Sequence, residues 1–233
     1  MQSHRLSGIE EALGYTFRDK ALLLEALTHR SYHYEHPKKA PYHNERLEFL
    51  GDSVLSFIAA RMLFALEERL SEAAMSRLKA HIVNGATLSD AAGDIDIGSY
   101  LRLGKGEEET GGKEKKSLRA DAIEAVIGAV YLDGGTEEAE RLIARLLGQR
   151  IKKLLQSGEY HDYKSRLQEE TQMRLGVLPE YRVISEEGKA HKKIFSVEVY
   201  VGQKRLGRGM GGSKKEAESA AAKEAIDGPK GIK

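Results

Sequence analysis

The chain has no cysteine, no tryptophan and only four prolines among its 233 residues. Without cysteine it forms neither disulfides nor thiolate metal sites, which suits a reducing compartment. It also lacks an apolar run long enough to span a bilayer, and its N-terminus, MQSHRLSGIEEALG, has no signal-peptide core. We therefore expect a cytoplasmic protein that does not enter a membrane.

A strong charge of one sign is absent as well, because the formal net charge is only +1. Charged residues make up 31% and hydrophobic residues 40% of the chain, which is typical of a soluble globular protein. The charge is unevenly spread. Residues 157–233 hold 15 lysines and arginines against 12 acids, so the basic surplus lies in the last third. A mildly basic domain is weak evidence for nucleic-acid binding.

Helical periodicity dominates the chain from Ile9 to about Leu155, so we predict an all-α domain over residues 1–155. Apolar residues recur at three- and four-residue spacing in KALLLEALTHRSY, RLEFLGDSVLSFIAARMLFALEERL and DAIEAVIGAVYLDGG. Stretches that break the helical period separate these segments, namely HPKKAPYHN, GDIDIGSY, GKGEEETGGKEKKS and DGGT. The longest of them, GKGEEETGGKEKKS from Gly104 to Ser117, predicts a solvated, mobile loop without a catalytic role.

A second domain is predicted over residues 162–230, after a linker at residues 156–161 where the helical period lapses. Its segments read as helix, three strands and helix, a small α+β unit in the order α-β-β-β-α. The central strand is the clearest, because Phe195, Val197, Val199 and Val201 alternate with polar residues. This order fits a separate domain of some seventy residues.

Acids stand inside an apolar helix at NERLEFLGDS. At about 100° per residue, Glu45, Glu48 and Asp52 share a stripe about 60° wide, opposite the apolar face. They could be solvated acids that complement the helix dipole, with Asn44 as the N-cap. However, Asp52 lies two turns in and follows Gly51. A glycine costs helix stability, so it indicates that another group approaches closely.

A second helix carries the complementary acids. In RADAIEAVIGAVYLDGG, Asp121 and Glu124 share one face amid apolar residues, and no basic residue occurs from Asp121 to Gly135. Burying such acids unpaired would be costly, whereas a hard cation such as Mg²⁺ prefers carboxylate oxygens. A metal site that activates water and stabilises charge at a phosphate is one interpretation. Solvated acids are the other, and spacing alone leaves both open.

The motif NERLEFLGDSVL resembles the signature of ribonuclease III. ALTHRSY, EAAMSRLKA and ADAIEAVIGAVYLDGG resemble that family's other blocks in the same order, and the tail resembles its double-stranded RNA-binding domain. The resemblance implies a helical nuclease domain that forms a homodimer. It also implies hydrolysis of double-stranded RNA with Mg²⁺, or Mn²⁺ as a substitute, to 5′-phosphate and 3′-hydroxyl ends with short 3′ overhangs. Ribosomal RNA precursors and some messenger RNAs would be the substrates.

The same resemblance assigns roles to individual acids in the nuclease domain. Glu48, Asp121 and Glu124 match the metal ligands, and Asp52 matches the catalytic aspartate, with Glu124 equally indispensable. Two further acids, Glu45 and Glu72, match supporting positions. Glu72 could equally be a first-turn acid after the N-cap Ser71. The aromatic Phe49 falls beside the acid stripe and matches a dimer-interface position.

In the tail, the SKKE sequence from Ser213 to Glu216 is a capping box that starts the last helix. Lys214 and Lys215 then oppose the helix dipole, which favours an anion at this helix start, although two exposed lysines would look the same. The resemblance makes this pair a phosphate clamp. It assigns Gln168 and His191 to the minor grooves on either side.

Two other functions fit parts of the sequence. One is a binding protein that holds double-stranded RNA without cutting it, against which the intact set of acids argues. The other is a metal-dependent phosphohydrolase for small nucleotides, which would not need a duplex clamp. Serine–histidine catalysis has no supporting motif, and we expect His29 in LTHRSY to have a structural role.

Overall fold

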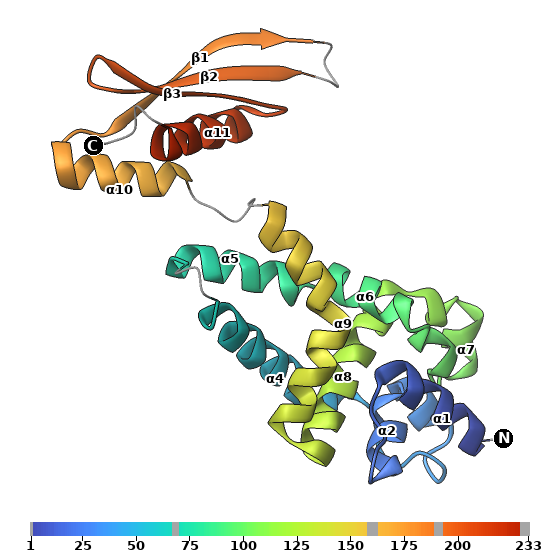
Figure 1. Cartoon of the computed structure of the whole chain (residues 1–233). Coiled ribbons are helices and arrows are strands. Elements are labelled where there is room, and N and C mark those ends of the chain that lie inside the picture. The colour runs from blue at the N-terminus through green and yellow to red at the C-terminus, as the bar shows by residue number, and fades with distance from the viewer. Residues whose placement is uncertain (1, 67–69, 158–162, 189–192, 229–233) are drawn as a thin grey trace. The chain divides into compact units, whose positions relative to one another are not determined.

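The computed structural model describes residues 2–66, 70–157, 163–188 and 193–228, and the chain divides into two units, Met1–Tyr160 and His161–Lys233. The described part of the first unit is helical, and the second has a helix, three strands and a helix (Figure 1). This confirms the predicted fold class. Within the described residues, no helix combines the length and apolarity needed to cross a membrane.

The first unit is built around one central helix, α8. Its flanking helices pack from several sides, and α4 and α6 make the most extensive contacts with it (Figure 1). The described elements of this unit are α1 (Gln2–Leu13), α2 (Lys20–Ala26), α3 (Arg30–Glu35), α4 (Glu45–Phe64), α5 (Glu72–Ile82), α6 (Gly85–Asp94), η1 (Ile97–Tyr100), α7 (Lys105–Glu109), η2 (Gly112–Glu114), α8 (Lys116–Gly134) and α9 (Thr136–Ser157).

The α4–α8 crossing is unusually close because a glycine stands at the contact on each helix. A Cβ built on Gly51 would lie 1.7 Å from the carbonyl oxygen of Glu124. One on Gly128 would lie 2.3 Å from the carbonyl oxygen of Leu47. Real Cβ atoms do not come so close, so only glycine allows the two backbones to meet here. The close approach predicted beside Gly51 is confirmed, and the approaching group is the backbone of α8.

The glycine-rich segment 104–117 is folded, so its prediction as a loop was wrong. It forms α7, η2 and the first residues of α8. Gly104 donates its N–H to the Ser31 hydroxyl at 2.9 Å, and Lys115 Nζ lies 2.6 Å from a Glu107 carboxylate oxygen. Composition suggested solvation because the segment is polar. Its polar groups instead bond to one another and to α3.

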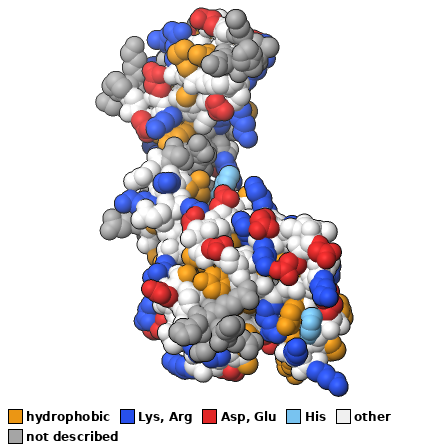
Figure 2. Space-filling model, turned by 90° about the vertical axis from the view of Figure 1, so that its right-hand side faces the viewer, with side chains coloured by type: hydrophobic (Ala, Val, Ile, Leu, Met, Phe, Trp, Pro, Cys, Tyr) orange, Lys and Arg blue, Asp and Glu red, His pale blue; other side chains and the backbone are white. Residues whose placement is uncertain are grey.

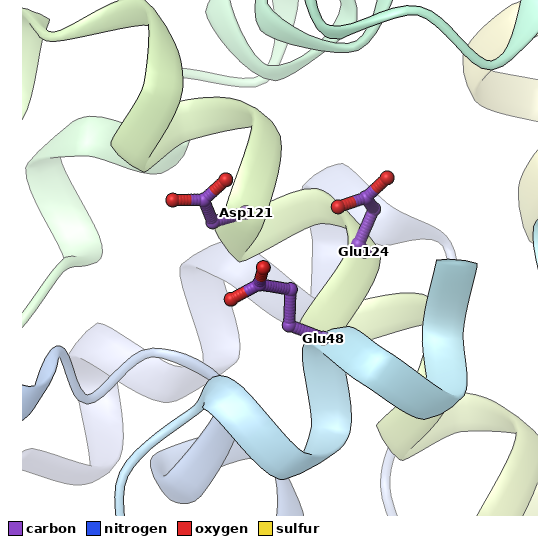
Figure 3. A group of neighbouring side chains, drawn as sticks. All are labelled: Glu48, Asp121 and Glu124. Atoms are coloured by element: carbon purple, nitrogen blue, oxygen red, sulfur yellow. The ribbon is translucent and has the colours of Figure 1, made fainter. Parts of the chain in front are cut away.

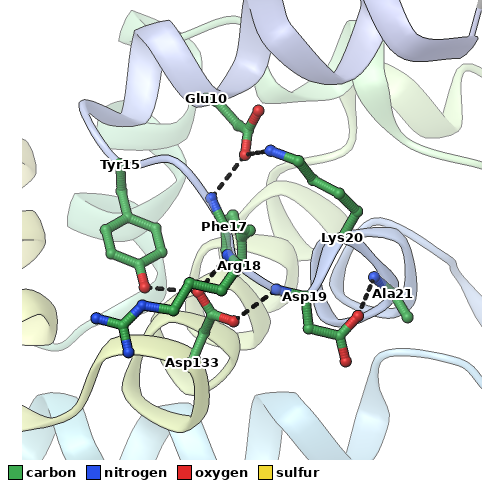
Figure 4. A network of polar contacts seen from close by, with 8 residues as sticks. All are labelled: Glu10, Tyr15, Phe17, Arg18, Asp19, Lys20, Ala21 and Asp133. Carbon is green, nitrogen blue, oxygen red and sulfur yellow. Dashed lines mark hydrogen bonds and ion pairs between the residues drawn. The ribbon is translucent and has the colours of Figure 1, made fainter.

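One carboxylate at the end of α8 accepts hydrogen bonds from the turn between α1 and α2 (Figure 4). Asp133 accepts hydrogen bonds from the Tyr15 hydroxyl at 2.6 Å and from the backbone N–H groups of Arg18 and Asp19, both at 2.8 Å. Burial, followed by the hydrogen bond to Asp133, raises the pKa of Tyr15 to about 12. The buried Glu10 on α1 accepts a further backbone hydrogen bond from the same turn.

The second unit consists of an antiparallel sheet with helices on one side (Figure 1). The predicted core residues Val197 and Val199 are buried, but the polar residues Ser196 and Glu198 between and beside them are buried as well, so burial does not alternate along the central strand. The last helix lies directly on the third strand because that strand is rich in glycine: a Cβ on Gly209 would lie 2.2 Å from the backbone nitrogen of Ala221. The elements are α10 (Tyr163–Leu175), β1 (Pro179–Glu187), β2 (Ile194–Val201), β3 (Lys204–Gly211) and α11 (Lys214–Asp227), in sheet order β1-β2-β3.

The predicted linker at residues 156–161 falls across the end of α9. Gln156 and Ser157 are the last residues of this helix. Residues 158–162 lie outside the described part of the chain, so the exact domain boundaries stay a prediction.

Candidate active site

Three carboxylates from two helices meet beside the α4–α8 crossing. Glu48 comes from α4, and Asp121 and Glu124 come from α8 (Figure 3). One oxygen of each carboxylate lies within 4.8 Å of the others, and all three side chains are half-buried. The predicted juxtaposition of the two acidic helices is therefore observed. We call these three residues the acid cluster.

Burial and the charges of neighbouring acids raise the pKa values of all three carboxyls in the acid cluster. Burial, with the charges of Asp52 and Glu48, raises the pKa of Glu124 to about 7. Burial is also the main cause that raises the pKa of Glu48 and of Asp121. No lysine or arginine in the described part of the chain forms an ion pair with any of the three.

This chemistry fits a hard divalent cation. Carboxylate oxygens are the ligands that Mg²⁺ prefers, and a cation would relieve the repulsion that now favours protonation. The arrangement could therefore hold a metal ion and present it to a phosphate.

Asp52 and Glu45 lie on α4, one on each side of Glu48. Both are exposed, and Asp52 is close enough for its charge to raise the pKa of Glu124. Glu45 pairs with Arg30, whose Nη1 lies 3.2 Å from the carboxylate. Asn44 occupies the predicted N-cap position, but its side chain makes no capping bond, and its backbone is already helical, with φ −72° and ψ −18°. Its backbone N–H donates to the Thr28 carbonyl at 2.9 Å, which ties α4 to the chain before α3.

Glu72 begins α5 and does not belong to the acid cluster. It is exposed, and its carboxylate accepts a hydrogen bond from the Ser76 hydroxyl at 2.7 Å. Ser71 caps this helix by accepting from the N–H of Ala74, as predicted. This geometry suits a first-turn acid, and a supporting role of Glu72 at the RNA stays a prediction.

Phe49 is 78% exposed on α4, beside the acids and away from the core. Two further phenylalanines on the same helix, Phe57 and Phe64, were not among the predicted interface residues and are 58% and 81% exposed. At 100° per residue the three rings fall within about 80° of one another. The repeated phenylalanine in FLGDSVLSFIAARMLF was the signal. We call these three residues the phenylalanine stripe.

In the second unit, the candidate RNA-binding residues are exposed where the structure describes them. Gln168 lies on α10, and Lys214 and Lys215 form the first turn of α11. Ser213 accepts from the N–H of Glu216 at 3.2 Å, which confirms the N-cap. The returning bond of the box goes one residue further back than usual, to Gly212 N–H at 2.8 Å. The fourth candidate, His191, lies outside the described residues.

Acidic and basic side chains lie close together on the face shown in Figure 2. The described side chains on that face form no broad surface of one sign.

Comparison with known proteins covers both units. A family model described as ribonuclease-III-like matches residues 19–151, and a double-stranded RNA binding motif matches residues 163–227. Ribonuclease 3 of Geobacter sulfurreducens is 43% identical over 94% of this chain and 89% of its own length. Ribonuclease 3 of Caldanaerobacter subterraneus is 46% identical over 95% of this chain and 96% of its own.

A solved structure also resembles the first unit. The nuclease domain of ribonuclease III from Campylobacter jejuni matches with a TM-score of 0.56 and 41% identity, covering 61% of this chain and 95% of that domain. That work describes structural flexibility in a region involved in dimer formation. The matches run through both units in the order that the sequence motifs predicted, and the acid cluster lies within the first matched region. This chain therefore belongs to the ribonuclease III family.

Proposed function

We propose that this endoribonuclease hydrolyses double-stranded RNA with Mg²⁺ held by Glu48, Asp121 and Glu124. The observation that carries the proposal is the acid cluster, where three carboxylate oxygens lie within 4.8 Å of one another and no lysine or arginine among the described residues forms an ion pair with them. Mn²⁺ would substitute, since it accepts similar oxygen ligands. When bound, such an ion lowers the pKa of a water and neutralises charge on the phosphate.

Each acidic residue of the site has its own proposed role. Glu48 and Asp121 are half-buried and supply fixed oxygen ligands from two helices. Asp52 is exposed next to Glu124, where it can accept a hydrogen bond from the attacking water and orient it. The pKa of Glu124 is raised to about 7, so this carboxyl is partly protonated at neutral pH. A bound cation would lower that pKa and release the proton. Glu45 and Glu72 would act at the edge of the site, towards the RNA.

Direct attack of water on phosphorus, with departure of the 3′ oxygen, leaves a 5′-phosphate and a 3′-hydroxyl. A metal ion held by these carboxylates would activate the water, so the RNA's own 2′-hydroxyl would not be needed as the nucleophile. Because a duplex has two strands, two active sites held at a fixed offset would cut them at staggered positions. The resemblance to ribonuclease III implies that these staggered ends are short 3′ overhangs.

A homodimer would supply the second site. The phenylalanine stripe on α4 runs beside the acid cluster, and such a large exposed apolar surface is typical of an interface. Closed two-fold dimers use the same surface on both partners, so one stripe serves both. The dimer-forming region described for the Campylobacter jejuni nuclease domain supports this proposal.

The second unit would hold the duplex. A-form RNA presents its 2′-hydroxyls in a wide minor groove, with phosphates across the major groove between. Lys214 and Lys215 at the α11 N-terminus suit those phosphates, since helix N–H groups and lysines both attract anions. Gln168 on α10 suits one minor groove, and His191 is proposed for the next. Cleavage of ribosomal RNA precursors and some messenger RNAs, in the cytoplasm, stays a prediction.

The decisive experiment is cleavage of a long RNA duplex by the full chain with Mg²⁺, with EDTA, on a matched DNA duplex, and by Glu124→Gln. Short duplex products only from RNA with Mg²⁺, lost in the variant, support the proposal. Duplex binding without cutting in either Mg²⁺ or Mn²⁺ would instead identify a protein that only holds double-stranded RNA.

A further inference from the structure

A partly enclosed cavity of about 240 Å³ lies in the first unit among α1, α2, α3, η1, α7 and η2. None of the acids of the proposed active site lines it. Its apolar walls are formed by leucines, among them Leu24, Leu27, Leu101 and Leu103, of which the last three are buried. Because a dry cavity of about 150 Å³ already takes a benzene-sized molecule, this one can hold a compact apolar group of at least that size.

One wall of the cavity carries a cation, Arg102, on the segment between η1 and α7. The guanidinium carbon lies 4.4 Å from the centroid of the Tyr32 ring, and Nη1 donates to the Thr28 hydroxyl at 3.0 Å. The backbone is fixed as well, since the N–H of Arg102 donates to the Leu27 carbonyl at 2.8 Å and its carbonyl accepts from His29 N–H at 3.1 Å. The guanidinium is therefore held in one orientation at the edge of the cavity.

The charge of Arg102 has no counterion in the fold. Among the described residues its guanidinium makes one hydrogen bond, to Thr28, and forms no ion pair with a carboxylate. The other cation of the cavity differs, because the Lys113 ammonium pairs with Glu108. A guanidinium has five N–H donors in its plane, and stacking a ring on its face leaves the donors at its edge accessible. Most of these donors are thus available to an acceptor in the cavity.

We propose that this cavity binds a small monocarboxylate with a compact apolar body, whose carboxylate pairs with the edge of the Arg102 guanidinium. Carboxylate and guanidinium match each other in a planar, bidentate geometry. One unpaired cation suits a single negative charge, and the leucine walls suit an apolar body, which free phosphate lacks. An apolar lining with a few fixed polar groups is typical of small-molecule sites. The inference does not depend on the acid cluster or on catalysis.

The probe is benzoate, compared with benzamide as its neutral isostere and with inorganic phosphate as an anion that has no apolar body. Binding is followed on the full chain through the methyl NMR signals of the leucines that line the cavity. Arg102→Met removes the charge, whereas Leu24→Phe fills the space and leaves the cation in place. The matched control is Leu132→Phe, at a leucine of α8 that is 53% exposed. The melting temperature of each variant shows whether it is folded.

We expect benzoate to shift the cavity methyl signals saturably. Benzamide should bind about tenfold or more weakly, and Arg102→Met should weaken benzoate binding to a similar extent, because a hydrogen bond between two charged groups is lost. Leu24→Phe should abolish binding, whereas Leu132→Phe should leave it unchanged. If Arg102→Met does not fold, Leu24→Phe and the benzamide comparison still decide the question.

The opposite results would overturn the inference. They are the absence of any saturable shift with benzoate, equal affinity for benzoate and benzamide, and binding that survives Leu24→Phe. Shifts of the same methyl signals by inorganic phosphate as large as those by benzoate would also overturn it, because the apolar walls would then play no part. Arg102 would in these cases be a cation that stacks on Tyr32 and is neutralised by solvent ions.

Discussion

Replacing Gly51 by alanine tests whether the α4–α8 crossing builds the active site. By helix propensity alone, alanine in the middle of a helix is more stable than glycine by about 1 kcal/mol. The crossing reverses that expectation, since the new Cβ would lie 1.7 Å from the Glu124 carbonyl oxygen. To reach 3.0 Å, the closest approach that real Cβ atoms show, the backbones must separate by about 1.3 Å. Both helices are packed into the core, so neither can move freely.

We expect Gly51→Ala to lower the free energy of unfolding by about 3 kcal/mol, as overpacking of a tight contact does. The same displacement would separate Glu48 on α4 from Asp121 and Glu124 on α8, so Mn²⁺ affinity should fall as well. Urea denaturation in EDTA measures the first effect, and Mn²⁺ titration of the folded variant measures the second.

The matched control is Gly148→Ala on α9. A Cβ on Gly148 meets nothing within 4 Å, so this variant should be unchanged or stabilised by up to about 1 kcal/mol. If Gly51→Ala were as stable as Gly148→Ala and bound Mn²⁺ like the wild type, the crossing would not be the constraint that positions the acids.

Three further outcomes are expected. Because the pKa of Glu124 is raised from 4.5 to about 7 on folding, its contribution to stability is full below pH 4.5 and is lost as the pH rises through 7. Urea denaturation in EDTA at a series of pH values should show this decline in the free energy of unfolding. Mg²⁺ should oppose the decline, and Glu124→Gln should lack it. Tyr15→Phe removes the hydrogen bond to Asp133 and should lower the free energy of unfolding by about 1 kcal/mol at pH 7. Because folding raises the pKa of Tyr15 from 10 to about 12, its contribution to stability is full below pH 10 and is lost as the pH rises towards 12, so the wild type should approach the variant in stability over that interval. Parallel curves of unfolding free energy against pH for the two proteins would contradict this reasoning. Phe49→Asp should shift the chain from dimer to monomer in size-exclusion chromatography with light scattering, whereas Met173→Asp, equally exposed on α10, should not.

The amino-acid sequence determined the elements and much of the chemistry by itself. Helical periodicity, strand alternation and the Ser213 cap are local patterns, because each depends on residues a few positions apart. The acid stripe of Glu45, Glu48 and Asp52 follows from helical spacing in the same way. The family motifs were equally readable, since they are short blocks in a fixed order.

Only the tertiary structure decided which residues meet. Glu48 and Asp121 are far apart in the chain, and the glycines at the α4–α8 crossing bring them together. Predictions from neighbouring residues were wrong where contacts between distant segments determine the structure. Asn44 stands at the start of α4, but its side chain does not cap that helix. The polar segment 104–117 folds because α3 and its own charges satisfy its polar groups. His29 was expected to be structural, and its Nδ1 does cap α3 by accepting from the N–H of Ser31 at 3.3 Å. The acids whose charges act on it come from three separate helices, which the sequence could not show.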